Sequence, residues 1–355
     1  MKIAVACGGT GGHILPGVVT AGELERRGHN VVLWLSGRDV EAVSAADWKG
    51  ARRYVPGCGL PSGLSLRSFY ALFILLRGVF QAYRIMRLDP PEVVLAMGSY
   101  AGAAPVLAAR MLGIPVVLHE SNAVPGRANL LLARFARCVG IHFSEAAAYF
   151  RQGRCVTVGF PLRPLESVPL DCTELEKDCF TLLVMGGSQG AVFLNDAVIG
   201  VLQRLKDAGK RIQTIHLCGK ANESVVAEAY GKHGLRGLVR GFWPDMGAAY
   251  AACDMALCRA GAATCAELAA TGTPALLVPL PSAMMNHQEA NARALEKCGG
   301  VDVCRQTDLT VDYLFAYLSR FIDNAAALEI RAESLRNADG YAGAVRLADL
   351  VEQGA

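Results

Sequence analysis

A strand that runs into a glycine-rich turn opens the chain: Ile3-Ala4-Val5-Ala6-Cys7 is followed by Gly8-Gly9-Thr10-Gly11-Gly12-His13. The same order returns near the middle, where residues 181–185 lead into Gly186-Gly187-Ser188-Gln189-Gly190-Ala191. After a strand, glycines let the backbone approach an anion closely, and the N-terminus of the following helix favours a phosphate. A tight turn without a ligand is the alternative for either turn alone. Two such turns in corresponding positions favour two phosphate-binding units.

Short β-branched runs alternate with helical patterns along the chain, which indicates parallel α/β architecture. The expected strands are residues 3–7, 31–35, 93–97, 116–119, 139–143 and 156–159, then 181–185, 212–218, 255–258 and 275–279. They are continuous apolar runs, as expected for strands that are covered on both faces. We therefore predict two facing Rossmann-like domains with parallel sheets and a cleft between them.

The domain boundary is expected near Arg163, because Pro161 and Pro164 accompany a loss of periodicity. The first domain then covers residues 1–162 and the second residues 163–340. A C-terminal helix, residues 341–355, is expected to pack back on the first domain.

Composition excludes several classes of protein. Of 355 residues, 52% are hydrophobic and 19% charged, and the net charge is only +3, which favours a folded protein that does not bind nucleic acid. The apolar start is too short for a signal peptide. Twelve cysteines without a CxxC pair indicate reduced thiols in the cytoplasm rather than disulfides or a zinc site. No Asp-x-Asp sequence occurs, so we expect neither a metal nor a cofactor.

His13 lies where the first glycine turn enters its helix. One interpretation is a hydrogen bond across the turn. The other is a general base, since a helix N-terminus disfavours the imidazolium form and leaves the ring able to accept a proton. Neither glycine turn carries the Lys-Ser/Thr of a Walker loop, and neither fits GxGxxG, so nucleotide hydrolysis and dinucleotide binding are not favoured.

Four segments in order, residues 8–13, 119–126, 186–191 and 258–291, resemble successive motifs of the bacterial MurG family. The resemblance implies a GT-B fold and an inverting transfer of GlcNAc from UDP-GlcNAc. It implies as acceptor the C4 hydroxyl of MurNAc in undecaprenyl-diphosphate-MurNAc-pentapeptide (lipid I), which gives lipid II for peptidoglycan. By the same resemblance, the enzyme is peripheral on the cytoplasmic face of the inner membrane and can meet other wall-synthesis proteins.

The resemblance also implies site residues, with His13 as the catalytic base. The acceptor side would comprise Thr10, Gly11, Gly12, Tyr100 and Asn122. The diphosphate side would comprise Arg163, Ser188, Gln189 and Gly190. The uracil, ribose and GlcNAc would be bound by Trp243, Ala262, Ala263, Thr264, Glu267, Gln288 and Asn291, with Glu267 on the ribose. Thr264-x-x-Glu267 also fits a capping box at a helix start, which is the alternative for that pair.

Three positions depart from the family pattern, and all three lie in the first domain. Ser121 stands where the family commonly has Gln, Ser99 where it commonly has a second Gly, and Phe160 where it has an Asn. They concern the acceptor side and leave the donor motifs intact.

Residues 66–88 form a strongly apolar helical pattern in which Arg77, Gln81, Arg84 and Arg87 make one narrow basic face. Such a segment can lie on an anionic bilayer, with its apolar side inserted and its arginines at the headgroups. The alternative is a core helix with a solvated stripe.

Two other functions fit parts of the pattern. A different UDP-sugar enzyme of the same fold, acting on another lipid or as an epimerase, would share the donor motif, residues 261–267. A non-catalytic UDP-sugar-binding partner of a wall-synthesis complex would keep the fold without turnover.

Overall fold

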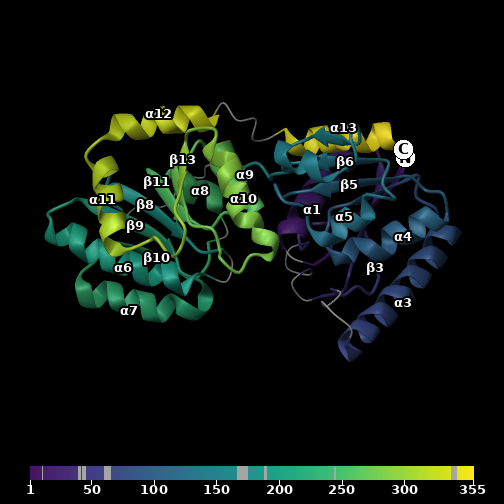
Figure 1. Cartoon of the computed structure of the whole chain (residues 1–355), viewed down its shortest axis with the longest axis horizontal. Coiled ribbons are helices and arrows are strands. Elements are labelled where there is room, and N and C mark those ends of the chain that lie inside the picture. The colour runs from purple at the N-terminus through teal and green to yellow at the C-terminus, as the bar shows by residue number, and fades with distance from the viewer. Residues whose placement is uncertain are drawn as a thin grey trace. The chain divides into compact units, whose positions relative to one another are not determined.

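The computed structural model describes residues 1–9, 11–38, 41, 45–59, 65–165, 175–187, 190–243, 245–336 and 342–355. The chain divides into two compact units (Figure 1). The first comprises Met1–Arg163 with Tyr341–Ala355, and the second comprises Pro164–Gly340. Each unit contains one parallel sheet between helices, which confirms the predicted pair of Rossmann-like folds.

The first unit has a seven-stranded sheet in the order β3-β2-β1-β4-β5-β6-β7. Its strands are β1 (Lys2–Ala6), β2 (Asn30–Leu35), β3 (Ala51–Tyr54), β4 (Val93–Ala96), β5 (Val116–Glu120), β6 (Cys138–Ile141) and β7 (Cys155–Thr157). Strand β1 pairs with β2 on one side, Ile3 opposite Val31, and with β4 on the other, Ile3 opposite Val93. The strand order reverses between β1 and β4, which is where open α/β sheets bind ligands.

Helices cover both faces of this sheet. They are α1 (Gly11–Arg26), α3 (Leu66–Leu88), α4 (Ala103–Met111), α5 (Arg127–Leu132) and α13 (Gly343–Gly354), with 3-10 turns η1 (Tyr100–Gly102) and η2 (Ser144–Tyr149). Alternate residues of β1 point to opposite faces. Ile3 and Val5 pack in the cluster that contains α1 and α13, whereas Ala4 and Ala6 pack in the cluster that contains α3 and α4.

Helix α13 joins the first unit although it follows the whole second unit in sequence (Figure 1). Its buried Leu347 and Val351 pack in the same cluster as α1. Polar contacts hold its outer side, because Arg27 Nη1 lies 2.7 Å from Asp349 Oδ1 and 2.8 Å from Glu352 Oε2.

The second unit has a six-stranded sheet in the order β10-β9-β8-β11-β12-β13, and its order reverses between β8 and β11. Its strands are β8 (Phe180–Met185), β9 (Ile212–Leu217), β10 (Gly237–Arg240), β11 (Met255–Cys258), β12 (Ala275–Leu277) and β13 (Val301–Val303). Its helices are α6 (Val192–Asp207), α7 (Glu223–His233), α8 (Met246–Ala251), α9 (Ala262–Thr271), α10 (His287–Glu296), α11 (Val311–Ile322) and α12 (Ala325–Arg336), with 3-10 turns η4 (Lys220–Asn222) and η5 (Met284–Asn286).

All ten predicted strands are confirmed to within two residues at each end. Three strands were not predicted, namely β3, β10 and β13. Strand β3 is the sequence Ala51-Arg52-Arg53-Tyr54, most of it exposed at a sheet edge, so it lacks the apolar run that marks the buried strands.

Candidate functional site

The loops that follow the strands on either side of each reversal contain most of the predicted site residues. In the first unit these loops follow β1 and β4, and in the second they follow β8 and β11. Thr10, Ser188 and Gln189 lie outside the described residues. The other predicted residues can be placed, and the two units are described separately.

In the loop after β1, a buried carboxylate accepts a hydrogen bond from a backbone N–H group. Gly9 N–H donates to Glu41 Oε1 at 2.9 Å, and Gly37 N–H donates to Glu41 Oε2 at 2.7 Å. The Ser36 hydroxyl also donates to Glu41. Glu41 is 1% exposed and ties this loop to the one after β2. A Cβ at Gly8 would lie 2.6 Å from the Ala101 Cβ, so the glycine permits close contact with the loop after β4.

His13 lies in the first turn of α1, after Gly11 and Gly12, and is partly exposed. Its Nδ1 lies 2.9 Å from the carbonyl oxygen of Met97, the residue that follows β4. A carbonyl oxygen only accepts, so Nδ1 carries the proton and the neutral ring has its lone pair on Nε2. The alternative interpretation is therefore right that His13 forms a hydrogen bond, but Nδ1 reaches the loop after β4 rather than across its own glycine turn. This bond also fixes the tautomer that a base acting through Nε2 requires.

The loop after β4 contains a strained residue. Ser99 has φ 67° and ψ 163°, a region occupied almost exclusively by glycine. Its Oγ reaches the Gly9 backbone so closely that a Cβ on Gly9 would lie 2.4 Å from it. Tyr100 follows, with the Arg38 guanidinium 5.2 Å from its ring centre. Ser99 is one of the departures from the family pattern, and the backbone conformation explains why glycine suits this position.

Replacing Ser99 with Gly should therefore stabilise the first unit by about 1–3 kcal/mol, since the strain disappears. Thermal unfolding would measure this as a higher Tm. Ser99→Ala is the matched control, because alanine removes the hydroxyl but keeps the strained Cβ. An equal gain from Ala and Gly would show that the hydroxyl, and not the backbone, is unfavourable.

The loop after β5 is organised by a second buried carboxylate, Glu120, which is 2% exposed. It accepts from Asn122 N at 2.9 Å, Asn122 Nδ2 at 3.2 Å, Gly126 N at 3.1 Å and Asn129 Nδ2 at 2.9 Å. Asn122, a predicted site residue, is thus held in place by Glu120. Sequence reasoning missed Glu120, Asn129 and Glu41, whose partners become visible only in the folded loops.

The departures Ser121 and Phe160 are both buried, at 3% and 4% exposure. The Ser121 hydroxyl lies 3.4 Å from His119 Nδ1, and His119 Nε2 lies 3.1 Å from the Gly159 carbonyl. Phe160 packs edge-on to His119, and burial lowers the pKa of His119 to about 4. Both departures therefore act on packing inside the unit.

Arg163 forms an exposed ion pair, with its Nη2 2.9 Å from Asp47 Oδ2. It lies at the last residue of the first unit's main segment. An exposed pair of this kind contributes little to stability, so Arg163 can change partner at small cost.

In the glycine turn after β8, Gly186 and Gly190 are as closely packed as Gly8 and Gly9 in the first turn. Gly190 has φ 76°, and a Cβ there would lie 2.1 Å from the Cys218 carbonyl oxygen at the end of β9. A Cβ at Gly186 would lie 2.3 Å from the Ala191 N. Both positions therefore require glycine, and α6 begins two residues after Gly190. A helix N-terminus after a glycine turn suits a phosphate group.

Helix α9 carries the predicted donor motif. Gly261 is its N-cap, no side chain caps it, and Ala262, Ala263 and Thr264 form its first turn. Thr264 is thus inside the helix, and the capping-box alternative is wrong. The Glu267 carboxylate instead accepts from the Tyr250 hydroxyl at 2.9 Å. Burial raises the pKa of Glu267 to about 7, and the bond from Tyr250 opposes that rise.

The remaining donor-side residues surround the same end of the sheet. Gln288 is partly exposed and its Oε1 accepts from Leu280 N at 2.9 Å. Asn291 is fully buried, and its Nδ2 donates to the Ala260 carbonyl at 3.2 Å, so it supports the loop after β11 from inside. Trp243 follows β10 and is partly exposed, next to the exposed Phe242.

Arg259 was missed by sequence reasoning. It is 7% exposed and donates from Nη1 to the Val278 carbonyl at 3.0 Å and from Nη2 to Gln306 Oε1 at 2.7 Å. It therefore joins the loops that follow β11, β12 and β13. An arginine beside a donor motif gives no sign in the sequence that it points inward.

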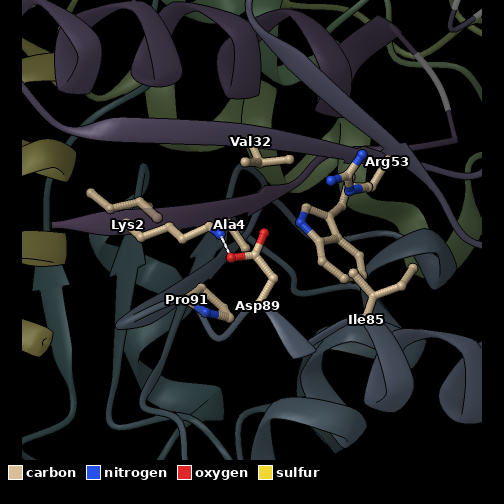
Figure 2. A pocket seen from close by; sticks show the side chains of 9 residues that line it. Lys2, Ala4, Val32, Arg53, Ile85, Asp89 and Pro91 are labelled. Carbon is tan, nitrogen blue, oxygen red and sulfur yellow. Dashed lines mark hydrogen bonds and ion pairs between the residues drawn. The ribbon is translucent and has the colours of Figure 1, made fainter. Parts of the chain in front are cut away.

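Two cavities lie away from these loops. One is lined by residues of β1, β2, β3 and α3, and Figure 2 shows Lys2 directed at Asp89 beside it. The other is lined by β13 and α11, including Tyr313 and Tyr317. Neither includes a predicted site residue. Within the described part of the chain, no group of three His, Cys, Asp or Glu side chains could hold a metal ion.

Helix α3 presents large apolar side chains outward. Its buried positions are small or slender, namely Ala71, Gly78, Ala82 and Met86, and a Cβ at Gly78 would lie 2.4 Å from the Pro56 carbonyl. In contrast, Phe69, Phe73 and Phe80 are 64%, 61% and 63% exposed. The alternative of a core helix with a solvated stripe is therefore wrong. By length and composition alone, α3 could also cross a membrane.

The chain matches two family models, the glycosyltransferase family 28 N-terminal domain over residues 3–141 and the C-terminal domain over residues 181–347. A UDP-N-acetylglucosamine--N-acetylmuramyl-(pentapeptide) pyrophosphoryl-undecaprenol N-acetylglucosamine transferase from Syntrophotalea carbinolica is 37% identical over 92% of both chains. The protein of the same name from Aeromonas hydrophila is 38% identical over 98% of this chain and 95% of its own.

Among solved structures, Acinetobacter baumannii MurG superposes with a TM-score of 0.80 at 28% identity over 99% of both chains. A Listeria monocytogenes protein described as a UDP-N-acetylglucosamine 2-epimerase has a TM-score of 0.71 at 12% identity, over 98% of this chain and 94% of its own, and so shares the fold alone. The two sheets, the predicted GT-B fold and the length of the match agree. The chain belongs to the MurG family of glycosyltransferases.

Proposed function

We propose that this chain transfers GlcNAc from UDP-GlcNAc to the C4 hydroxyl of MurNAc in lipid I, giving lipid II. The observation that carries the proposal is His13, fixed by the Met97 carbonyl with its lone pair on Nε2 at the point where the strand order reverses. Relatives named as N-acetylglucosamine transferases match nearly the whole chain.

In the reaction, His13 Nε2 takes the proton of the C4 hydroxyl as that oxygen attacks C1 of GlcNAc. The bond from C1 to the β-phosphate oxygen breaks, and UDP leaves with the electron pair. Attack from the opposite face inverts the configuration at C1. The N-terminus of α6 and the backbone around Gly190 would stabilise the charge that develops on the diphosphate. Thr10, Gly11, Gly12, Tyr100 and Asn122 would hold the acceptor.

On the donor side, Glu267 would accept from the ribose hydroxyls and Gln288 would bind the GlcNAc hydroxyls. Gln288 Oε1 already accepts a hydrogen bond from Leu280 N, so the amide NH₂ of Gln288 would be the group that donates to the sugar hydroxyls. The backbone at Trp243 would bind the uracil edge, and Ala263 and Thr264 would contact the nucleotide. Arg163 would exchange Asp47 for the diphosphate.

Transfer of labelled GlcNAc to a soluble lipid I analogue tests the function. We expect product that depends on the acceptor. Folded protein that binds UDP but gives no product would favour a non-catalytic binding partner, and conversion of UDP-GlcNAc to its 2-epimer would favour the epimerase.

We further propose that α3 holds the enzyme on the cytoplasmic face of the membrane, lying flat with Phe69, Phe73 and Leu76 inserted. Arg77, Arg84 and Arg87 are also exposed and would meet anionic headgroups. These charges within the helix favour a surface position over a spanning one.

Replacing Phe69, Phe73 and Leu76 with Ser should lower binding to anionic vesicles by about tenfold or more, since three inserted side chains are lost. Sedimentation with vesicles measures this, and salt should weaken wild-type binding. Val225 and Ile330, which are 67% and 68% exposed in the second unit, provide the control when changed to Ser. Unchanged sedimentation of the folded triple variant would reject α3 as the anchor.

A further inference from the structure

Tyr250 is a buried phenol beside the donor motif. It lies on α8, is 3% exposed, and its hydroxyl donates to Glu267 Oε2 at 2.9 Å. The same hydroxyl lies 3.8 Å from the Met185 sulfur, at the end of β8 just before the glycine turn. Tyr250 thus connects the strand that enters the turn with the carboxylate on α9.

This hydrogen bond fixes one edge of the carboxylate and leaves the other available. Within the described residues, Tyr250 is the single side chain that donates a hydrogen bond to Glu267, and no Lys or Arg there forms an ion pair with it. Oε2 is held by the tyrosine, so Oε1 keeps its full capacity to accept from a ligand. A carboxylate with one oriented oxygen is suited to bind a pair of adjacent hydroxyl groups.

A second tyrosine–carboxylate pair in the same unit shows the contrast. Tyr317 donates to Asp302 Oδ2 at 2.8 Å, but Arg331 Nη2 also lies 2.8 Å from that oxygen. Asp302 therefore has a cation beside it as well as a hydrogen-bond donor. Among the described side chains, the Glu267 carboxylate has the Tyr250 hydroxyl as its one hydrogen-bond donor.

The remaining ionisable groups near Glu267 stay neutral at physiological pH. Among the described residues they are the thiols of Cys258 on β11 and Cys265 on α9, and the thiol of Cys253, which follows α8, lies near Tyr250. Burial raises the pKa of each thiol, to about 12 for Cys265. The pKa of Glu267 is raised by burial and lowered by Tyr250, with no contribution from the charged groups of α10 or α12, which also pack on α9.

We infer that Tyr250 is a positioning residue of the nucleotide site, whose hydroxyl orients Glu267 and supports its ionised form for the ribose hydroxyls of UDP. Tyr250 thereby sets the preference of the enzyme for a ribonucleotide over a 2′-deoxyribonucleotide. This inference rests on the proposed assignment of Glu267 to the ribose.

Calorimetric titration with UDP and with 2′-deoxy-UDP tests it, and the ratio of the two affinities is the readout. We expect the wild type to favour UDP by about tenfold or more, as for a hydrogen bond to a charged group. Tyr250→Phe should reduce the ratio several-fold. Tyr317→Phe, which removes the hydroxyl of the other tyrosine–carboxylate pair in this unit, should leave it unchanged. A ratio in Tyr250→Phe within twofold of wild type would overturn the inference.

Glu267→Gln separates this failure from failure of the ribose assignment. If the wild type and Glu267→Gln each bind UDP and 2′-deoxy-UDP with equal affinity, the assignment of Glu267 to the ribose fails, and the inference fails with it. GlcNAc transfer is tested by a separate experiment. If Glu267→Gln loses the preference and Tyr250→Phe keeps it, the inference alone fails.

The pH dependence of the affinity ratio is a second readout, which a purely structural role of Tyr250 would not change. Titration of the diphosphate affects both nucleotides equally and therefore cancels from the ratio. The preference should fall as the pH drops through about 7, where Glu267 takes up a proton. Tyr250→Phe should move that midpoint to higher pH. Should Tyr250→Phe not fold, Tyr250→3-fluorotyrosine keeps the ring and hydroxyl as a stronger donor, and should move the midpoint to lower pH. An unmoved midpoint would overturn the inference.

Discussion

Replacing His13 with Ala is expected to lower kcat for GlcNAc transfer by about 10²–10⁴ while the affinity for UDP stays unchanged. The reason is that a positioned base contributes this much to a proton transfer. His13 lies in the first unit, on α1, whereas the donor motif lies in the second. Steady-state kinetics with a lipid I analogue and calorimetric titration with UDP measure the two quantities separately.

His13→Asn is the matched variant. Its side-chain NH₂ can replace Nδ1 as donor to the Met97 carbonyl, but an amide has no basic lone pair. It should keep the loop contact and be as inactive as the alanine variant. Restoration of turnover by Asn would mean that His13 serves to join the loops after β1 and β4, and that another group is the base.

Replacing Gly190 with Ala is expected to destabilise the second unit by about 3 kcal/mol or more and to abolish UDP binding. The new Cβ would lie 2.1 Å from a backbone carbonyl, that of Cys218, and a backbone atom at a strand end cannot move aside cheaply. The positive φ of 76° adds a further cost. Thermal unfolding should show a Tm lower by roughly 6–12 °C.

Gly209→Ala controls for the backbone conformation. Gly209 has φ 73°, and no atom lies within 4 Å of its added Cβ. It should cost only about 1–2 kcal/mol and leave UDP binding intact. Equal losses of Tm in the two variants would contradict a special packing requirement at the glycine turn.

The sequence predicts the framework well because buried parallel strands and glycine turns are local patterns. Both turns were found at the ends of β1 and β8, where the strand order reverses. The edge strand β3 was missed because Arg52 and Arg53 interrupt any apolar run. Strands β10 and β13 are short and also lie at sheet edges.

Several parts of the site that escaped prediction depend on partners distant in sequence. Glu41 bonds to Gly9, Tyr250 to Glu267, and Arg259 to Val278. In each case an ordinary residue type acquires its role from a partner on another loop or helix. The capping box at Thr264 is wrong for the opposite reason, because the local motif suggested a helix start where there is none. Helix α9 begins at Ala262, so Thr264 lies inside its first turn and not at the N-cap.

The linkage in the product of the transfer reaction tests the central claim most directly. The proton NMR spectrum of the isolated product should show GlcNAc joined through a β bond to C4 of MurNAc, since displacement from the α-linked donor inverts C1. An α-linked product would contradict direct displacement with His13 as base. Free sugar or epimerised UDP-sugar without an acceptor linkage would contradict the transfer itself.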